Sequence, residues 1–444
     1  MGYKRYERYK DSGVEWIGEV PEGWDLYKIT WIFNLISSGT TPPTANIEYY
    51  DGNIPWINTG DLNDGYIFDT PKTVTKVAFQ ECSALKLFPV NTLLIAMYGA
   101  TIGKTGITKI VAATNQACCA LAKPSKAVPK FIFYWFLSNR NHIISMAYGG
   151  GQPNISQNLI KSLRIPLPKI EEQKNIVCFL DQKTVEIDNL IADKEKMVQL
   201  LQEMRQAIIS EAVTEGLDKN VKMKDSGVEW IGEIPEHWEV KRLKYLVWLI
   251  VEKASEDDID KPYIGLENIE AKIGRIKFYA NEEESFTESD SLLFEPNDIL
   301  FGKLRPYLAK CIVADFYGRC TSELLILRCR SIISNYLYYF MLSDMFIKTV
   351  NSSTYGAKMP RANWSYIGNL KVVLPDTAEQ KHIINYINKK TNIIDSLISD
   401  IRTQITKLKE YRQSLISEAV TGKINVRNFM QSTEGGVQND CNAG

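Results

Sequence analysis

Two long stretches of the chain place apolar residues at alternating spacings of three and four. The first, residues 171–216, contains no proline, and its only glycine is its last residue. The second repeats the pattern 207 residues later. This period is typical of a coiled-coil seam, held here for about five heptads in each stretch. The seam positions are Ile187, Ile191, Val198, Leu201 and Ile208 in the first stretch, and Ile394, Ile398, Ile401, Ile405, Leu408 and Leu415 in the second.

Polar residues interrupt both seams at equivalent points. Thr184 and Arg205 break the first seam, and Thr391 and Arg412 break the second. A single short apolar stripe would also fit an ordinary core helix. The length of these stripes and their repetition favour two long helices packed on each other, and the matched seams allow an antiparallel pair.

The duplication extends beyond the helices. Residues 10–19 and 224–233 both read KDSGVEWIGE. The repeating unit is therefore a lead-in, a globular segment and a long helix, with a period of about 210 residues, which is too long for a solenoid. We predict globular domains at 1–170 and 217–377, long helices at 171–216 and 378–424, and a disordered tail at 425–444.

The globular segments contain short apolar and β-branched runs between turn residues, the pattern of strands. Each also has one aromatic-rich stretch that predicts a helix, at 129–146 and 334–350. The fold class we expect is α+β: two mixed α/β domains joined by two long helices in an antiparallel coiled coil, with an internal pseudo-two-fold repeat. The predicted strands are 49–57, 73–79, 92–98 and 107–111 in the first half, and 262–266, 273–279, 298–301 and 310–313 in the second.

Net charge is −1, but charge is distributed unevenly. Residues 1–170 hold 17 Lys+Arg against 12 Asp+Glu, and residues 299–371 hold 10 against 3. Residues 252–298 are acidic, with 5 against 14. A phosphate-binding surface needs local rather than global positive charge, so the globular halves remain candidates for binding nucleic acid.

Other classes of site find little support. The eight cysteines have no CxxC spacing and the three histidines are scattered, so we expect no metal site and no histidine-based catalytic triad. The stretch 99–105, GATIGKT, resembles a phosphate-binding loop but has three residues between its glycines where that motif needs four, which indicates a basic loop after a strand. The chain shows neither a signal segment nor an apolar run of membrane-spanning length, so we expect a cytoplasmic protein with no membrane partner.

Residues suited to contacting DNA cluster on equivalent loops of the two halves. Lys and Arg suit phosphates, while Asn, Gln, Arg and Lys suit base edges. Framework residues agree between the halves, for example Thr114–Gln116 with Thr321–Glu323, whereas GGQPNI in the first half faces AKMPRA in the second. One scaffold with two different surfaces suits the reading of two different sequences. The candidates are Tyr98, Lys104, Asn115, Gln116, Gln152 and Asn154 in the first half, and Lys303, Arg305, Tyr307, Lys310, Ser322, Lys358 and Arg361 in the second.

With these residues in view, the chain resembles the specificity subunit, HsdS, of type I restriction–modification systems. The resemblance covers about residues 10–424 and rests on several motifs together. They are the repeated DSGVEWIGE lead-ins, TLLIAMYGATIGKTGI at 92–107, NDILFGKLRPYLAK at 297–310, IPLPKIEEQKNI at 165–176, VVLPDTAEQKHI at 372–383 and the two ISEAVT helix ends.

The resemblance implies a non-catalytic subunit with two target-recognition domains, each reading one half of a bipartite DNA target. The long helices would set the spacer and dock two modification subunits. Those partners would carry S-adenosylmethionine and adenine methylation, and separate restriction subunits would carry ATP, Mg²⁺, translocation and cleavage; no cofactor is expected in this chain. Three alternatives remain open: the same subunit in a methyltransferase that lacks the nuclease, a coiled-coil scaffold that reads no DNA, and an enzyme in its own right.

Overall fold

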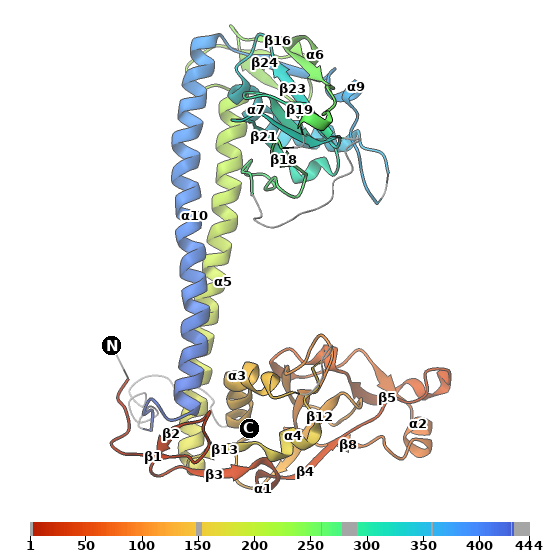
Figure 1. The fold of residues 1–444 in the computed structure, drawn as a ribbon, viewed down its shortest axis with the longest axis vertical. Helices are drawn as coiled ribbons and strands as arrows, with labels where there is room; N and C mark the ends of the chain where they lie inside the picture. Colours follow the sequence, from red (N-terminus) through yellow and green to blue (C-terminus); the bar gives the residue numbers. More distant parts are fainter. Residues whose placement is uncertain are drawn as a thin grey trace. The chain divides into compact units, whose positions relative to one another are not determined.

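The computed structural model describes residues 3–147, 153–258, 260–277, 291–356, 358–427 and 429 of the chain. It divides into two compact units, Met1–Asp193 with Gln404–Gly444, and Lys194–Thr403. The long helices α5 (Ile170–Thr214) and α10 (Thr377–Val420) contribute to both units. Each unit thus contains one globular domain and a segment of each long helix (Figure 1). No helix among the described residues has the length and apolarity needed to cross a membrane.

The two helices run antiparallel within each unit. In the first unit, Asn175 on α5 contacts Arg427 just after α10, and Asp188 contacts Arg412. Residue numbers thus increase along α5 while those of the contacting residues decrease along α10, as in an antiparallel pair. In the second unit Arg205 contacts Asp395. These contacts, with the two α+β domains, confirm the predicted fold class.

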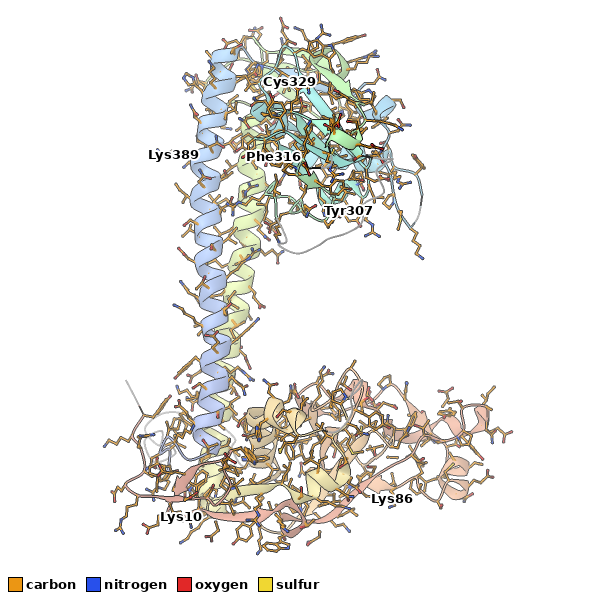
Figure 2. The ribbon with its side chains drawn as sticks, viewed as in Figure 1. Lys10, Lys86, Tyr307, Phe316, Cys329 and Lys389 are labelled. Carbon is orange, nitrogen blue, oxygen red and sulfur yellow. The ribbon has the colours of Figure 1, made fainter. Side chains whose placement is uncertain are left out.

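The predicted seam positions lie between the paired helix segments. Of the seam residues, Ile187, Ile191, Ile394, Ile398, Ile401, Ile405 and Leu415 are buried, and Val198, Leu201, Ile208 and Leu408 are half-buried. Thr184 and Thr391 are buried in the same seam. The Thr184 hydroxyl donates to the Leu180 carbonyl at 2.7 Å, so its polar group is satisfied within its own helix. Lys389 illustrates the opposite face of α10, because its side chain points away from α5 (Figure 2).

The first domain is built from two main sheets and two short ones. Its strand orders are β4-β12-β9-β10-β6 and β7-β5-β11-β8, with separate β3-β13 and β1-β2 pairs. The strands are β1 (Tyr9–Asp11), β2 (Glu19–Pro21), β3 (Asp25–Lys28), β4 (Phe33–Ser38), β5 (Tyr50–Ile57), β6 (Gly65–Ile67), β7 (Thr73–Val74), β8 (Leu87–Phe88), β9 (Leu93–Ala96), β10 (Thr105–Thr108), β11 (Ala112–Thr114), β12 (Cys118–Pro124) and β13 (Arg164–Leu167). The helices are α1 (Ile29–Ile32), α2 (Lys76–Glu81), α3 (Pro129–Ser145) and α4 (Gln157–Ser162).

The second domain repeats this topology. Its orders β17-β23-β20-β21 and β18-β22-β19 match β4-β12-β9-β10 and β5-β11-β8, and β16-β24 matches β3-β13. The strands are β14 (Met223–Asp225), β15 (Glu233–Pro235), β16 (Glu239–Arg242), β17 (Val247–Ile250), β18 (Tyr263–Ile264), β19 (Ser291–Phe294), β20 (Ile299–Gly302), β21 (Cys311–Val313), β22 (Gly318–Thr321), β23 (Leu324–Cys329) and β24 (Lys371–Leu374). The helices are α6 (Leu243–Leu246), α7 (Ser334–Leu342), α8 (Asp344–Ser352) and α9 (Trp364–Ile367).

Four predicted elements differ from the structure. The strand predicted at 107–111 covers only the end of β10, because the chain leaves that strand after Thr108 and bends before β11 begins at Ala112. The strand predicted at 73–79 ends at Val74, because the Thr75 hydroxyl accepts a hydrogen bond from Ala78 N at 3.2 Å and caps α2. The helix predicted at 334–350 is two helices, because Ser343 is extended and its hydroxyl caps α8. Within 273–277 the chain forms only an isolated bridge at Ile276; residues 278 and 279 of that predicted strand, and the tail after 429, lie outside the described residues.

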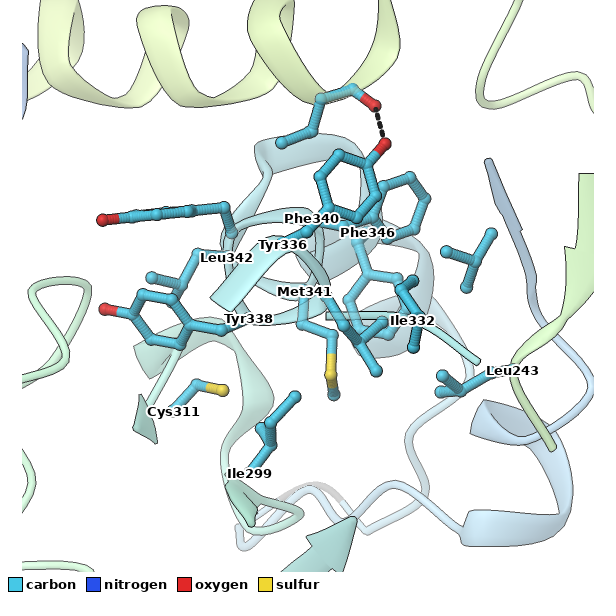
Figure 3. Close-up of a cluster of buried hydrophobic side chains, with 14 of the residues drawn as sticks. Leu243, Ile299, Cys311, Ile332, Tyr336, Tyr338, Phe340, Met341, Leu342 and Phe346 are labelled. Atoms are coloured by element: carbon cyan, nitrogen blue, oxygen red, sulfur yellow. Dashed lines mark hydrogen bonds between the residues drawn. The ribbon is translucent and has the colours of Figure 1, made fainter. Parts of the chain in front are cut away.

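An aromatic core centred on α7 forms one of two hydrophobic clusters among the described residues of the second domain (Figure 3). Tyr336, Phe340 and Phe346 are fully buried there. The Tyr336 hydroxyl donates to the Val213 carbonyl on α5 at 3.2 Å, so the core is continuous with the helix segment of the same unit. Burial and this hydrogen bond together account for a tyrosine rather than a phenylalanine at the centre.

The same Glu–Gln pair joins each domain to its long helix. The indole N–H of Trp24 donates to Glu172 Oε1 at 3.2 Å, and that of Trp238 donates to Glu379 Oε2 at 2.9 Å. The neighbouring glutamine is buried in both copies. Gln173 accepts from Val128 N and donates to Pro168 O, while Gln380 accepts from Ile333 N and donates to Pro375 O. Each glutamine therefore ties the helix start to the loop that begins α3 or α7.

Two ion pairs related by the repeat lie in very different surroundings. Arg205 and Asp395 have side chains only 9% and 12% exposed, whereas Arg412 and Asp188 are 31% and 51% exposed. Asp395→Asn should therefore lower the free energy of unfolding by about 3–5 kcal/mol, because it leaves a buried arginine unpaired. Asp188→Asn is the matched control and should cost about 0–1 kcal/mol. Urea unfolding of the full chain measures both, and equal costs would contradict the burial argument.

Candidate nucleic-acid interface

Three loops of the second domain meet beside the end of β20. Lys303 follows that strand, and its backbone N–H donates to the Glu323 carbonyl at 3.1 Å. Its own carbonyl accepts from Ala362 N at 2.9 Å. Arg361 pairs through its backbone with Tyr355 on the same returning loop. The structure thus brings together Lys303, Ser322 and Arg361, which the sequence had placed on three separate segments.

These loops enclose a cavity of about 400 Å³. Its lining includes Lys303, Ser322, Glu323, Tyr355, Arg361 and Trp364. Within it the Arg361 guanidinium donates to Glu323 Oε1 at 2.6 Å. The cavity therefore offers two cationic groups, one carboxylate and two aromatic side chains on a single domain.

Other candidates of the second domain lie on the adjoining loop 303–310. Arg305 is exposed and has a positive φ of 49°, a conformation that non-glycine residues adopt rarely, and its N–H is held by the Pro360 carbonyl at 2.8 Å. Tyr307 is 46% exposed on the 3₁₀ turn Pro306–Leu308, at the edge of the domain (Figure 2). Lys358 is exposed on the returning loop.

Lys310 lies in a more enclosed environment than its neighbours. Its ammonium donates to the Leu266 carbonyl, and burial lowers the pKa of the amine below its usual range. A lysine that is half-buried and bonded to the backbone serves first to hold loop 303–310 against the domain. Its contribution to a phosphate-binding surface is therefore smaller than that of an exposed lysine.

In the first domain, the candidates surround Met97 at the end of β9. Met97 N donates to the Ala117 carbonyl and Met97 O accepts from Ile155 N, both at 2.8 Å. Tyr98, Gln116 and Asn154 are each one residue from these contacts, so the structure brings them together. Gln116 is exposed, and its Oε1 accepts from the Thr41 hydroxyl at 2.6 Å. Gln152 lies outside the described residues.

Asn115 is engaged within the turn between β11 and β12. Its amide donates to Asn58 Oδ1 at 3.2 Å and accepts from Ala117 N at 3.1 Å. Of the two amides in Thr114–Gln116, Gln116 is thus the more available to a ligand.

The loop that carries Lys104 is fixed from behind by an ion pair. Arg140 on α3 donates to Asp64 Oδ1 at 2.5 Å and to the Gly103 carbonyl at 3.0 Å. Asp64 Oδ1 also accepts from Thr105 N at 3.0 Å. A side chain at Gly103 would meet Arg140 Cγ at 3.0 Å, and its φ of 74° also favours glycine. Gly103 is therefore required by the backbone conformation of the turn. The hydrogen bonds of Arg140 and Asp64 hold the loop that carries Lys104 in place.

Sequence reasoning missed Arg140, Asp64 and Trp364, because no pattern linked them to distant loops. Glu323 had a usable signal, since it aligns with Gln116, but its negative charge counted against it. Among the residues that the structure describes, no group of three His, Cys, Asp or Glu side chains is placed to hold a metal ion.

Comparison with known proteins identifies the family. The model of the type I restriction modification DNA specificity domain matches residues 21–197 and again 235–407. The type I restriction enzyme MjaIX specificity subunit of Methanocaldococcus jannaschii is 26% identical over 427 residues, covering 92% of this chain and 95% of that protein. The EcoDI specificity subunit of Escherichia coli is 20% identical over 426 residues, covering 92% and 90%.

Solved structures share the fold. One chain, from a structure described as the basis of complex assembly and conformational transition of the type I R-M system, superposes with a TM-score of 0.70 at 16% identity over 91% of this chain and 99% of that one. The HsdS subunit from Thermoanaerobacter tengcongensis gives 0.53 at 15% identity, with 91% and 98% covered. Because the family model matches both halves, the chain belongs to the type I restriction–modification DNA specificity family, HsdS.

Proposed function

We propose that this chain is the DNA-specificity subunit of a type I restriction–modification complex, that it is itself non-catalytic, and that each globular domain reads one half of a bipartite DNA target. The observation that carries the proposal is the contrast between scaffold and loops. The two domains share strand orders and backbone contacts, while the side chains at the ends of equivalent strands differ. Two copies of one scaffold with different loops suit two different half-sites.

The loop chemistry supports DNA as the ligand. Exposed or half-exposed Lys104, Lys303, Arg305, Lys358 and Arg361 provide phosphate and base contacts. They surround amide, hydroxyl and aromatic groups of the kinds that contact base edges. The acidic stretch 252–298 lies on other segments of the second domain, and its residues 278–290 are outside the described part.

The helices offer an apolar face for partner subunits. If the seam positions are a and d of a heptad, Met197, Leu200 and Met204 on α5 and Ile393 and Leu397 on α10 fall at positions g and c. All five are exposed, between 45% and 56%. In an antiparallel pair the g positions of both helices flank the same side of the seam, so in the second unit these residues form one stripe, named here the g/c stripe.

The opposite flank of the same helix segments is covered by the globular domain. Gln206 at position b donates to the Leu342 carbonyl, and Asn388 at position e accepts from the Tyr339 hydroxyl. Ile209 at position e is fully buried in the domain core. The g/c stripe is thus the flank left for a partner, and exposed apolar patches of this kind mark interaction sites.

We assign the g/c stripe to docking of one modification subunit, and the equivalent helix segment of the first unit, which is more polar at Glu186, Gln404 and Lys407, to docking of a second. In this proposal the modification subunits bind S-adenosylmethionine and methylate adenine, and restriction subunits bind ATP and Mg²⁺; this chain carries none of these cofactors. The long helices set the spacer between the half-sites. The complex acts in the cytoplasm, where its DNA target lies.

A domain transplant tests independent reading. Leu243 N donates to Leu370 O at 2.9 Å, just as Ile29 N donates to Leu163 O at 3.0 Å, so the same junction closes both domains. Replacing residues 29–163 by residues 243–370 should give a chain whose methylated sites, mapped with the modification subunit, carry the second domain's half-site sequence in both halves. The reciprocal transplant should duplicate the other half-site. Loss of specificity in the half that was not exchanged would contradict the proposal.

Two lysines on equivalent loops should behave differently. Lys104→Ala should weaken binding to all duplexes alike and reduce the slope of log affinity against log salt by about 1, as the loss of one phosphate contact does. Lys310→Ala should instead lower the free energy of unfolding by about 1 kcal/mol through loss of its hydrogen bond to Leu266, with the salt slope unchanged. Salt titrations and thermal unfolding separate the two effects, and the reverse pattern would mean that the assignments are exchanged.

The g/c stripe makes a prediction about assembly. Leu397→Glu should weaken association with the modification subunit by about 30-fold, the effect of losing a 2 kcal/mol hot spot, without lowering the unfolding temperature of the isolated chain. Ser396→Glu adds the same charge at the neighbouring exposed position on the outer face and should leave association unchanged. Equal effects of the two variants in a pull-down or titration would place the partner elsewhere.

A further inference from the structure

One carboxylate in the cavity of the second domain is only half satisfied. Glu323 Oε1 accepts from Arg361, but Oε2 is buried and makes no hydrogen bond within the described residues. The Arg361 side chain lies further out, at 46% exposure against 24% for Glu323. The guanidinium is therefore the more solvent-exposed member of the pair, in a cavity that both residues line.

Both residues are held in place by backbone contacts. Glu323 N donates to the Thr321 hydroxyl at 3.3 Å, and its carbonyl accepts from Lys303 N. Arg361 exchanges two backbone hydrogen bonds with Tyr355, of 3.3 and 3.1 Å. The ion pair is thus a fixed feature of the loop junction rather than a contact between two free side chains.

A purely stabilising role accounts poorly for this geometry. The structural ion pair of the same domain is Arg328 with Asp298, in which both carboxylate oxygens accept from the guanidinium, at 2.9 and 2.8 Å. Glu323 leaves one oxygen buried without a partner, which is costly, and a partly exposed pair contributes little stability in return. The pairing of Arg361 with a single oxygen of Glu323 beside a cavity therefore calls for another explanation.

The chemistry of arginine supplies one. A guanidinium has five N–H donors in a rigid planar fork, and Glu323 engages one nitrogen. The remaining donors match the O6 and N7 acceptors of guanine, the commonest specific contact in the major groove. A carboxylate behind the fork fixes its plane and prevents the side chain from turning to a phosphate.

We propose that Arg361 reads a guanine in the half-site of the second domain and that Glu323 is the positioning residue that orients it. This inference rests on the proposed function and specifies the base that is read at one position of the second half-site. A direct reading of a base by Glu323 itself fits less well, because its free oxygen is buried behind the arginine.

The first domain carries uncharged residues at the same place. Ile155 N donates to Met97 O as Ala362 N donates to Lys303 O, so Asn154 corresponds to Arg361. Met97 N donates to Ala117 O as Lys303 N donates to Glu323 O, so Ala117 corresponds to Glu323. Amides suit adenine rather than guanine. The arginine–carboxylate device, and with it the guanine, therefore belongs to the second half-site alone, and the first half-site serves as an internal control.

The test uses the full chain in complex with its modification subunit and a duplex library randomised over both half-sites, sequenced after methylation. Wild type should select guanine at one position of the second half-site. Arg361→Lys, which keeps the charge but loses the fork, should reduce that preference by about 5- to 150-fold. Glu323→Gln should relax the same position to a smaller extent and leave the first half-site unchanged. Glu295→Gln, which removes an ion pair with Arg328 elsewhere in the domain, should change neither half-site.

Three results would overturn the inference. They are a second half-site without a selected guanine, an Arg361→Lys variant that weakens all sequences equally, and a Glu323→Gln variant that changes a different base position. The last result would make Glu323 the reader. A wild-type complex without any sequence preference would instead refute the proposed function, so the two failures are distinguishable.

Discussion

The Glu–Gln pair at the start of each long helix, in which the glutamine is buried and the glutamate half-buried, is the contact on which the arrangement within each unit depends. Its carboxylate holds the indole of Trp24 or Trp238, and its amide joins the helix to the loop that begins α3 or α7. Burying such groups is unfavourable unless each is hydrogen-bonded, and here both are. The joint therefore favours one geometry strongly, and the candidate loops of each domain keep a fixed relation to the helix segment of their own unit.

The repeat also shows how one motif acquires different energetics. Arg205–Asp395 and Arg412–Asp188 are the same pair in the two copies. In the second unit the loop around Lys272 covers the pair, since Arg205 also donates to the Lys272 carbonyl and Arg275 adds a second cation to Asp395. In the first unit the corresponding pair remains exposed. Burial, rather than residue identity, decides which pair matters for stability.

The strands, the loops and the helix flanks differ in how far they are alike in the two copies. The scaffold strands are repeated with nearly the same order, the loops beside β9 and β20 differ in chemistry, and the helices divide their flanks between the domain and the g/c stripe. By their backbone contacts, Ala117 and Asn154 of the first domain occupy the positions that Glu323 and Arg361 occupy in the second. Divergence is thus concentrated in the loops to which we assign the two half-sites, and similarity in the strands and in the joint between domain and helix.

The sequence by itself determined the duplication, the two seams and the family, because these are patterns of period and identity that survive without knowledge of contacts. It also placed the candidate residues on equivalent loops of the two halves, because Pro153 and Pro360 align the returning segments. It could not show that Ser343 breaks the second aromatic helix or that Thr75 starts α2, since both depend on side-chain caps that compete with strong local propensity. Only the tertiary structure decided that Lys310 donates to the Leu266 carbonyl, that the Asn115 amide bonds to Asn58, and that Glu323 accepts from Arg361. The physical reason is that the fold determines which residues far apart in sequence become hydrogen-bond partners. The type and charge of a residue do not identify its partner.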